Sequence, residues 1–511
     1  MTAPANAGAA HHDITIAGAP EGLDAMVLAR LVEEAGIPAQ VKPGAGKTEA
    51  KAGILIHVAR DDRRVDALEA ALAFFSPAVK VIAFPAWDTV PYDRVGPNAD
   101  IVSKRISALA RLALSSRKEP VLVLTTVNAI LQRVPPRSFV REGLRPIAPG
   151  QRMDLNRLVK RMSLSGFRRV SQVIEPGEFA VRGGIVDLFA PGRSTPIRMD
   201  FFGDTLESIK AFDPTTQRTT KPIQKFALMP VSEAAFGEDA VARFRQRYVS
   251  LFGGSVANGD PLYEAVSAGS RYPGQEHWLP LYHDALETLF DYVPDAAVSF
   301  DHMSDQAVAE RFEQVREHYQ ARIEALDAQK FGAPPYRPVP PGDMFLDGPA
   351  WGKQLGARRV YRLTPFDQEG ANVRSWRGRP GRTFQLERQN PDLNVFDAVA
   401  AHLRSMQAAN KRAMIAAWTP GARERLASLL ADHGLKQVRK VESYAEALAL
   451  PGNVTALAVL GIERGFETPE IAIIGEQDIL GDRMVRQRKK PRKAVDVLAQ
   501  ASSLSVGDLV V

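Results

Sequence analysis

A block of short alternating segments between residues 172 and 218 constrains the fold more than any other part of this chain. Apolar and polar residues alternate in 179–182 and again in 197–201, which is the period of a half-buried strand. Glycines between the segments supply the positive φ angles that tight hairpin turns need. The block therefore predicts a compact β module, and it places Arg182, Arg193 and Arg198 on the sheet of that module.

The sequence on both sides of this block alternates strand and helix patterns. Buried-type strands are expected at 14–17, 53–58, 79–84 and 121–124, and amphipathic helices follow the first two. Such an order predicts a doubly wound parallel sheet of the α/β class with right-handed crossovers. A helix, a strand and a long helix resume at 240–251, 296–300 and 304–329, so the β module interrupts this domain.

The chain of 511 residues is too long for one hydrophobic core. Its patterns predict a multidomain α/β protein with six segments. These are a nucleotide-binding-like domain, first part (1–138), an inserted β-rich domain (139–230), the second part of the α/β domain (231–332), a proline-rich linker (333–352), a small α/β domain (353–482), and a basic linker with the start of a further domain (483–511).

Composition excludes several classes of site. The chain has no cysteine, which rules out disulfides, thiolate metal sites and cysteine nucleophiles. Its nine histidines show no metal-type spacing, so no metal site is expected. A run of eighteen apolar residues and a secretory leader are both missing from the sequence. We therefore expect a cytoplasmic protein without a membrane partner.

The net charge of +6 is concentrated in one stretch. Seven lysines and arginines fall between Arg483 and Lys493, and the rest of the chain is close to neutral. A solvated linker is the simplest interpretation of this tract, and a phosphate-binding arm for DNA is the alternative.

The position of a phosphate-binding loop, directly after the first strand, lacks the chemistry of one. Such a loop needs glycines followed by Lys and then Ser or Thr. Here Gly18 and Gly22 are followed by Leu23 and Asp24. After the strand at 296–300, Asp301 remains as a possible magnesium ligand, but no neighbouring glutamate could activate water. We interpret Gly18, Gly22, Asp24 and Asp301 as a degenerate nucleotide site that does not bind nucleotide.

The segment 44–48, Gly-Ala-Gly-Lys-Thr, matches only the end of a phosphate-loop motif. Pro43 interrupts the expected loop and no apolar helix pattern follows Thr48. A surface loop is the favoured interpretation, although an ATPase or helicase lobe with a noncanonical loop at Lys47 stays open as an alternative.

The blocks 172–189, 197–204 and 212–218, together with Phe-Pro-Ala-Trp-Asp-Thr-Val-Pro-Tyr-Asp at 84–93, resemble the bacterial transcription-repair coupling factor family, Mfd. They resemble more distantly the UvrA-binding domain of the excision-repair protein UvrB. The resemblance implies a degenerate RecA-like domain with an inserted UvrA-binding-type domain. It also implies that the RNA-polymerase-interacting domain, the ATP- and Mg-dependent translocase motor and its DNA contacts lie beyond Val511.

The resemblance further implies which residues contact UvrA. Arg182 falls on an arginine of the UvrB docking strand, and Arg168 or Arg169 falls on an upstream one, with Ala180 replacing a third. Glu178 and Phe179 flank Arg182, and Phe179 is expected to be an apolar anchor. The alternative for Arg182 is an internal pair with Glu178 or Asp187 that only orders the hairpin. The expected core phenylalanines of the module are Phe189, Phe201, Phe202 and Phe212.

The function implied by the resemblance is recruitment of UvrA to RNA polymerase stalled at a DNA lesion. This chain would then be non-catalytic and need no cofactor, while the full-length family member is an ATP-dependent DNA translocase. Two alternatives are kept: a UvrB-like ATPase or helicase lobe, and a DNA-binding protein that acts through the basic tract.

Overall fold

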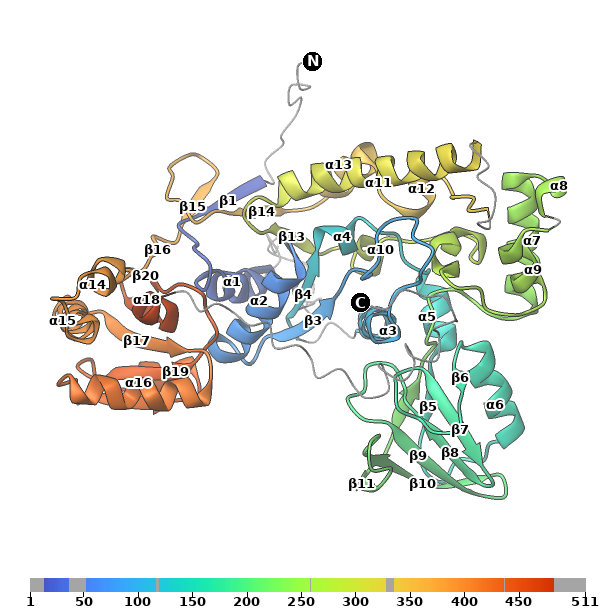
Figure 1. Cartoon of the computed structure of the whole chain (residues 1–511), viewed down its shortest axis with the longest axis horizontal. Coiled ribbons are helices and arrows are strands. Elements are labelled where there is room, and N and C mark those ends of the chain that lie inside the picture. The colour runs from blue at the N-terminus through green and yellow to red at the C-terminus, as the bar shows by residue number, and fades with distance from the viewer. Residues whose placement is uncertain are drawn as a thin grey trace, which may run out of the picture. The chain divides into compact units, whose positions relative to one another are not determined.

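The first compact unit is built on a seven-stranded sheet with the order β15-β1-β14-β13-β2-β4-β3, in which all neighbours are parallel (Figure 1). The adjacent inner strands β13, β2 and β4 are buried along their whole length, as is typical of parallel strands covered on both faces. The predicted doubly wound α/β class is confirmed. In sheet order, the strands are Val373–Ser375, Asp13–Ala17, Val360–Leu363, Ala297–Phe300, Ile54–Ala59, Val121–Thr126 and Lys80–Phe84.

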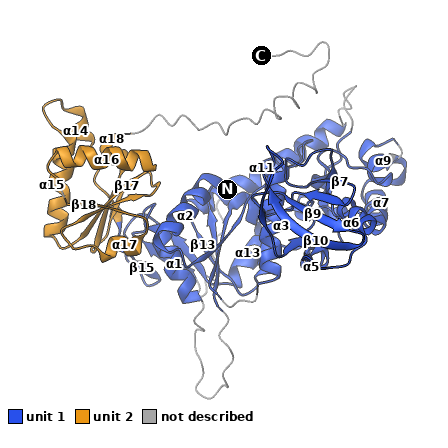
Figure 2. Cartoon of the chain, turned by 90° about the horizontal axis from the view of Figure 1, so that it is seen from below, with its two compact units in different colours: residues 1–378 blue, residues 379–511 orange. Residues whose placement is uncertain are grey.

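The computed structural model describes residues 13–35, 52–115, 119–257, 259–327, 335–435 and 437–481. The chain divides into two compact units, residues 1–378 and 379–511 (Figure 2). The segment 44–48 and the basic tract at 483–493 lie outside the described residues. Within the described part, no helix is both long and apolar enough to cross a membrane.

Helices flank the sheet of the first unit, and several begin with a side-chain cap. Asp61 caps α2 by accepting the N–H of Arg64, and Asn98 caps α3 by accepting the N–H of Asp100. The buried faces of α3, α4, α11 and α13 contribute to a core that includes Leu109 in α3 and Val308 in α11. The helices that flank the sheet are α1 (Asp24–Ala35), α2 (Asp62–Phe75), α3 (Ala99–Ala113), α4 (Val127–Ile130), α11 (Ser304–Asp327) and α13 (Gly348–Gly356).

A second, aromatic core lies in a helical part of the first unit. It buries Phe244, Tyr248, Trp278 and Tyr282 together with Tyr92, which comes from the loop after β3. Tyr92 therefore packs the loop onto this core and is not exposed to a ligand. The helices of this part and its neighbours are α5 (Arg137–Gly143), α7 (Glu238–Phe252), α8 (Gly254–Ala257), α9 (Pro261–Ser267), the 3-10 helix η1 (Gln275–Leu281), α10 (Leu289–Tyr292) and α12 (Pro341–Met344).

The β module is a six-stranded sheet with the order β11-β10-β9-β8-β7-β6, joined to the chain through the pair β5 and β12. Strands β7 to β11 form an antiparallel meander, while β6 pairs with β7 in parallel. Helix α6 (Leu155–Leu164) covers one face. The strands are β5 (Arg145–Ile147), β6 (Arg168–Arg169), β7 (Glu178–Arg182), β8 (Ile185–Leu188), β9 (Ile197–Phe202), β10 (Thr205–Phe212), β11 (Thr219–Pro222) and β12 (Phe226–Leu228).

The second unit has its own six-stranded sheet, with the order β16-β20-β21-β17-β19-β18. Four strands are parallel, and β20 adds to β21 in the antiparallel direction. The strands are Arg379–Pro380, Phe466–Glu467, Ile471–Gly475, Arg412–Ala417, Thr455–Val459 and Val438–Val441, and the helices are α14 (Gln385–Gln389), α15 (Val395–Ala408), α16 (Pro420–Asp432), α17 (Tyr444–Ala449) and α18 (Glu476–Leu480).

The expected start of the small α/β domain at residue 353 is wrong. Strands β14 and β15, at 360–363 and 373–375, pair with β1 in the first sheet, so the boundary between the compact units falls after residue 378. A short apolar strand does not reveal from its own sequence which of two sheets it joins, because that choice depends on pairing partners far away in the chain.

Candidate functional site: a closed sheet edge and an open sheet face

Two segments predicted to carry nucleotide ligands meet, together with a third segment, at one edge of the parallel sheet. The loop after β1 holds Gly18, Gly22 and Asp24, the segment after β2 leads into α2, and Asp301 follows β13. Carboxyl ends of parallel strands share an edge, and this is where ligands bind in open α/β sheets. The structure thus brings together the residues that the sequence assigned to the degenerate site.

The turn at Gly18 is already occupied by the chain itself. Gly18 has a φ of +62°, its N–H donates to the carbonyl of Phe366, and its own carbonyl accepts from the N–H of Gly378. A Cβ at Gly18 would lie 3.1 Å from the backbone nitrogens of Arg377 and Gly378. The backbone groups that would face a phosphate in a phosphate-binding loop are therefore used within the unit.

A buried arginine fills the space between the two aspartates. The Arg64 guanidinium pairs through Nη2 with Asp24 Oδ2, and its Nε lies 3.3 Å from Asp301 Oδ2. The Arg64 side chain is only 8% exposed, and those of Asp24 and Asp301 are less exposed still. Asp24 also accepts the N–H groups of Gly22 and Ala25 at 3.0 and 2.9 Å. Arg64, which the sequence analysis did not single out, is the centre of this cluster.

Burial has opposite effects on an acid and a base at this edge. Burial raises the pKa of Asp24 to about 6, despite the attraction of Arg64. Burial also lowers the pKa of His57 to about 4, so this imidazole is neutral at pH 7. His57 Nδ1 lies 3.0 Å from the hydroxyl of Ser299 on the neighbouring strand. The edge is therefore a closed, buried cluster in which Asp24 and Asp301 share one fixed cation, Arg64.

Within the described ranges, no group of three or more His, Cys, Asp and Glu side chains is arranged to hold a metal ion. In particular, the two aspartates of the closed edge share Arg64 as their counter-ion, as set out above.

The second candidate site is one face of the β module. Strand register places Ala180, Asp187 and Arg198 side by side on this face, with Arg182 and Asp200 in the next row. Phe179, Leu188 and Ile197 lie in register on the opposite face, which forms the core. We call the first of these the polar face. It carries alternating charge, and Lys210 on β10 extends it through a 3.3 Å pair with Asp200.

Arg182 belongs to a three-residue ion cluster on the polar face. Arg182 Nη2 pairs with Asp187 Oδ2, which is the internal pair that the sequence analysis kept as the alternative. Arg198 donates to the same carboxylate twice, at 2.7 Å from Nε and 2.9 Å from Nη2. Asp187 is buried, whereas the Arg182 side chain is 52% exposed. Arg182 therefore ends a buried network and still presents its guanidinium to solvent.

The two upstream arginines, Arg168 and Arg169, lie on opposite sides of β6. Arg168 donates to Glu178 at 2.5 Å, and its side chain is 64% exposed. Glu178 itself is buried and also accepts the N–H groups of Ile174 and Glu175. Arg169 follows Arg168 on β6, so it lies on the opposite side of that strand. The structure thus groups Arg168 and Arg182 on the polar face and leaves Arg169 off it.

Two expected roles of phenylalanines are wrong. Phe179 was expected to be an exposed anchor, but it is completely buried in the module core. Phe202 was expected in that core, but it is 77% exposed at the end of β9. Phe201 packs partly against this core, as expected, whereas Phe189 and Phe212 are buried in a separate small cluster with Ala180. The alternation along β9 explains Phe202, because Met199 and Phe201 already take the inward positions.

Phe202 and Ile185 are therefore apolar residues of the polar face that the sequence analysis missed. Ile185 is 37% exposed and lies opposite Arg182 in the β7–β8 pair. The arrangement combines cations with exposed apolar side chains, which is typical of protein interfaces and not of catalytic centres.

Two family models match this chain. The UvrB interaction domain matches residues 146–233, which cover the β module, and the MFD D3 domain matches residues 406–479 in the second unit.

Similar curated proteins include the transcription-repair-coupling factors of Haemophilus influenzae and Escherichia coli, which are 29% and 28% identical and each align with 91% of this chain. The one from Mycobacterium bovis is 29% identical and aligns with the whole chain. The chain spans about two fifths of the length of these relatives. The comparisons confirm the resemblance: along about nine tenths of its length this chain is similar to the transcription-repair coupling factors, with a UvrB interaction domain in its β module and an MFD D3 domain in its second unit.

Proposed function

We propose that this chain acts in transcription-coupled nucleotide excision repair by recruiting UvrA through the polar face of its β module. The observation that carries the proposal is the half-exposed Arg182 within a region that matches the UvrB interaction domain. Arginine suits such a surface because its planar fork binds carboxylates in two places at once. Contacts with RNA polymerase and DNA would belong to the parts of a coupling factor that this chain does not span.

The internal pair of Arg182 is compatible with this role. Arg198 alone makes two hydrogen bonds to Asp187, so Asp187 keeps a counter-ion when Arg182 turns to a partner. Leaving a buried carboxylate without a partner would be costly, and this arrangement avoids it. The Arg182 fork can therefore exchange its internal partner for a carboxylate on UvrA.

Calorimetric titration with purified UvrA tests the proposal. Arg182→Ala is expected to weaken binding by more than about 1 kcal/mol, as for a hot-spot arginine, and Phe202→Ala is expected to weaken it as well. Arg169→Ala is the matched control, because it removes a neighbouring arginine that lies off the polar face. If the folded wild-type chain does not bind UvrA, or if Arg169→Ala weakens binding as much as Arg182→Ala, the polar face is not the recruitment surface.

We further propose that this chain does not bind or hydrolyse nucleotide. The support is the closed sheet edge, where Arg64 lies between Asp24 and Asp301 and the Gly18 backbone groups are already paired. ATP with magnesium would instead act in the motor of the full-length coupling factors. Titration with MgATP at millimolar concentration tests this: saturable binding that Asp301→Asn abolishes would restore the ATPase alternative.

A further inference from the structure

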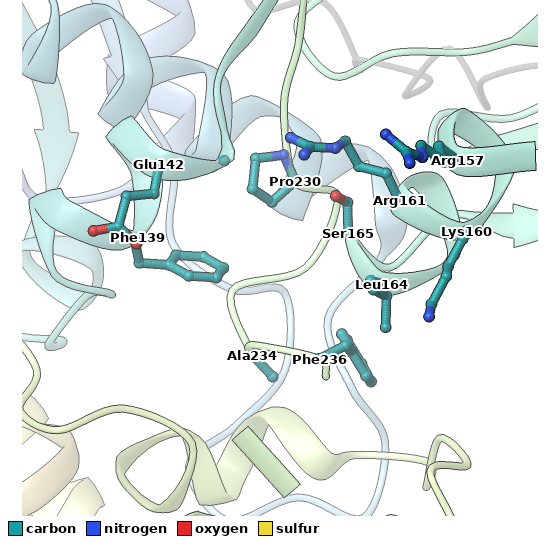
Figure 3. Close-up of a pocket in the computed structure, with 11 residues that line it drawn as sticks. Phe139, Glu142, Arg157, Lys160, Arg161, Leu164, Ser165, Pro230, Ala234 and Phe236 are labelled. Atoms are coloured by element: carbon teal, nitrogen blue, oxygen red, sulfur yellow. The ribbon is translucent and has the colours of Figure 1, made fainter. Parts of the chain in front are cut away.

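A basic hollow lies where the β module joins the α/β domain. It has a volume of about 470 Å³ and is lined by α6 of the module on one side and by Phe139 of α5 on the other (Figure 3). The segments around Gly143 and Pro230, which connect the module to the α/β domain, pack closely here, because a Cβ at Gly143 would lie only 2.4 Å from Pro230 Cγ. The N–H of Val231 donates to the carbonyl of Ser165 at 2.9 Å, which fixes the end of α6 against the outgoing segment.

Helix α6 presents one basic stripe to this hollow. Arg157, Lys160, Arg161 and Leu164 are spaced by three and four residues and are all exposed, while Leu158 and Met162 face the module core. Among the described residues, no carboxylate forms an ion pair with any of the three cations. Figure 3 shows Arg157 and Arg161 extending from α6 above the hollow, across from the ring of Phe139.

A second hollow, of about 440 Å³, differs because its cations have acidic residues and hydrogen-bond acceptors beside them. It also contains two arginines, Arg133 and Arg247, but Asp284 and Asp343 line it as well. Arg247 donates to the carbonyls of Pro280 and Asp284, and Arg133 donates to that of Gly342. The cations of α6 have no such internal partners within the described structure, and Glu142 alone supplies a carboxylate to the lining of their hollow.

Both aromatic rings that line the hollow already contact a side chain of this chain. The Phe236 ring lies under the Arg271 guanidinium, 4.9 Å from its centroid. The Phe139 ring packs edge-on against His283, with 4.9 Å between centroids. Single-stranded nucleic acid needs open ring faces for its bases as well as cations for its phosphates. The chemistry therefore favours an acidic polypeptide that carries an apolar side chain.

We propose that this hollow is a docking site for an acidic segment of a partner protein, which inserts one aliphatic or aromatic side chain against Leu164. The carboxylates of the segment would pair with Arg157, Lys160 and Arg161, and the anchor would cover the exposed Leu164. The site lies on α6, which packs on the core face of the module, and so it is separate from the polar face. It does not depend on the proposed binding of UvrA.

Fluorescence anisotropy with a short labelled peptide, in which glutamates and aspartates surround one Leu-Phe pair, tests the proposal. The triple variant Arg157→Glu, Lys160→Glu, Arg161→Glu is expected to weaken binding at least tenfold, and Leu164→Ala several-fold. The matched control reverses three exposed cations elsewhere on the same module, Arg218→Glu, Lys221→Glu and Lys225→Glu, and is expected to change affinity less than twofold.

Arg157→Gln with Arg161→Gln serves as a milder version if the triple variant does not fold, as judged by circular dichroism. Three results would overturn the proposal: no saturable binding of the peptide at millimolar concentration, equal losses in the triple variant and its control, or tighter binding of an oligothymidine than of the peptide. Arg182→Ala is expected to leave peptide binding unchanged, which separates this site from UvrA recruitment.

Discussion

Arg64 and Arg182 make similar bonds in very different surroundings. Each guanidinium pairs with a buried carboxylate, Arg64 with Asp24 and Asp301 at the sheet edge and Arg182 with Asp187 on the module. The Arg64 side chain is 8% exposed, whereas that of Arg182 is 52% exposed. Removing a buried partner leaves uncompensated charge, and removing an exposed one lets water replace it. Burial, and not the ion pair itself, separates a structural arginine from one that can bind a partner.

The largest expected effect is at the sheet edge. Arg64→Ala leaves two aspartates buried without a cation, and we expect the free energy of unfolding to fall by about 3–5 kcal/mol. Urea unfolding followed by tryptophan fluorescence measures it, because Trp351 packs against Phe300 of β13 with 5.9 Å between ring centroids.

The control for this prediction is Arg60→Ala. Arg60 pairs with Glu21 at 2.8 Å, but both side chains are more than a third exposed, so we expect a loss below about 1 kcal/mol. Adding Asp24→Asn and Asp301→Asn to Arg64→Ala removes the stranded charges and should restore part of the stability. Similar losses for Arg64→Ala and Arg60→Ala would contradict the distinction drawn from burial.

The α/β domain and the β module should also differ in how acid affects their stability. Burial lowers the pKa values of His57, His277 and His283 to about 4, below the usual 6.5. The unfolded chain therefore takes up protons first as the pH falls. The stability that these neutral imidazoles provide is complete above pH 6.5 and is lost between about pH 6.5 and 4, by at most about 3 kcal/mol for each histidine.

The β module makes a control for this prediction within the same chain, because residues 139–230 contain no histidine. Hydrogen exchange measured by mass spectrometry at pH values across this window follows both regions at once. We expect protection of β2 and β13 to weaken relative to that of β8 and β9 as the pH falls. Equal weakening in both regions would show that histidine titration does not control acid stability.

The smallest effect is expected within the polar face. Asp187→Ala removes the shared acceptor and leaves the mostly buried Arg198 without its carboxylate partner, which should cost about 2 kcal/mol. Arg182→Ala leaves the pair of Arg198 with Asp187 intact and should cost less than about 1 kcal/mol. Thermal unfolding of the two variants measures the difference. A larger loss for Arg182→Ala would make this arginine structural and weaken its proposed role in recruitment.

The parallel sheet was predictable because its strands are local apolar runs. The strands expected at 53–58 and 121–124, for example, lie at 54–59 and 121–126. The meeting of Asp24 and Asp301 was also predictable, since carboxyl ends of parallel strands share an edge. Arg64 was not predictable, because an arginine in the first turn of a helix usually faces solvent and only the tertiary packing places it between two aspartates.

The two phenylalanines were misassigned although the sequence contained the signal. Phe179 shares its strand face with Val181, and both have the inward phase of β7. Phe202 follows Phe201 directly, so only one of them could join Ile197 and Met199 inside. Strict use of the two-residue period would have placed Phe179 in the core and Phe202 on the surface. The helical period of the basic residues on α6 was equally visible in the sequence. That these residues line a hollow could not be predicted, because the opposite side of the hollow comes from distant segments such as α5.

The sheet order also determines when each part of the chain can fold during synthesis. β1 is the first described strand to leave the ribosome, yet its partner β14 follows only after the whole β module, with Asp13 pairing to Val360. The module sheet closes between residues 168 and 222 and needs no later segment for its strand pairs. We therefore expect the module to mature while β1 is still an unpaired edge, open to wrong strand partners until residues near 375 have been translated.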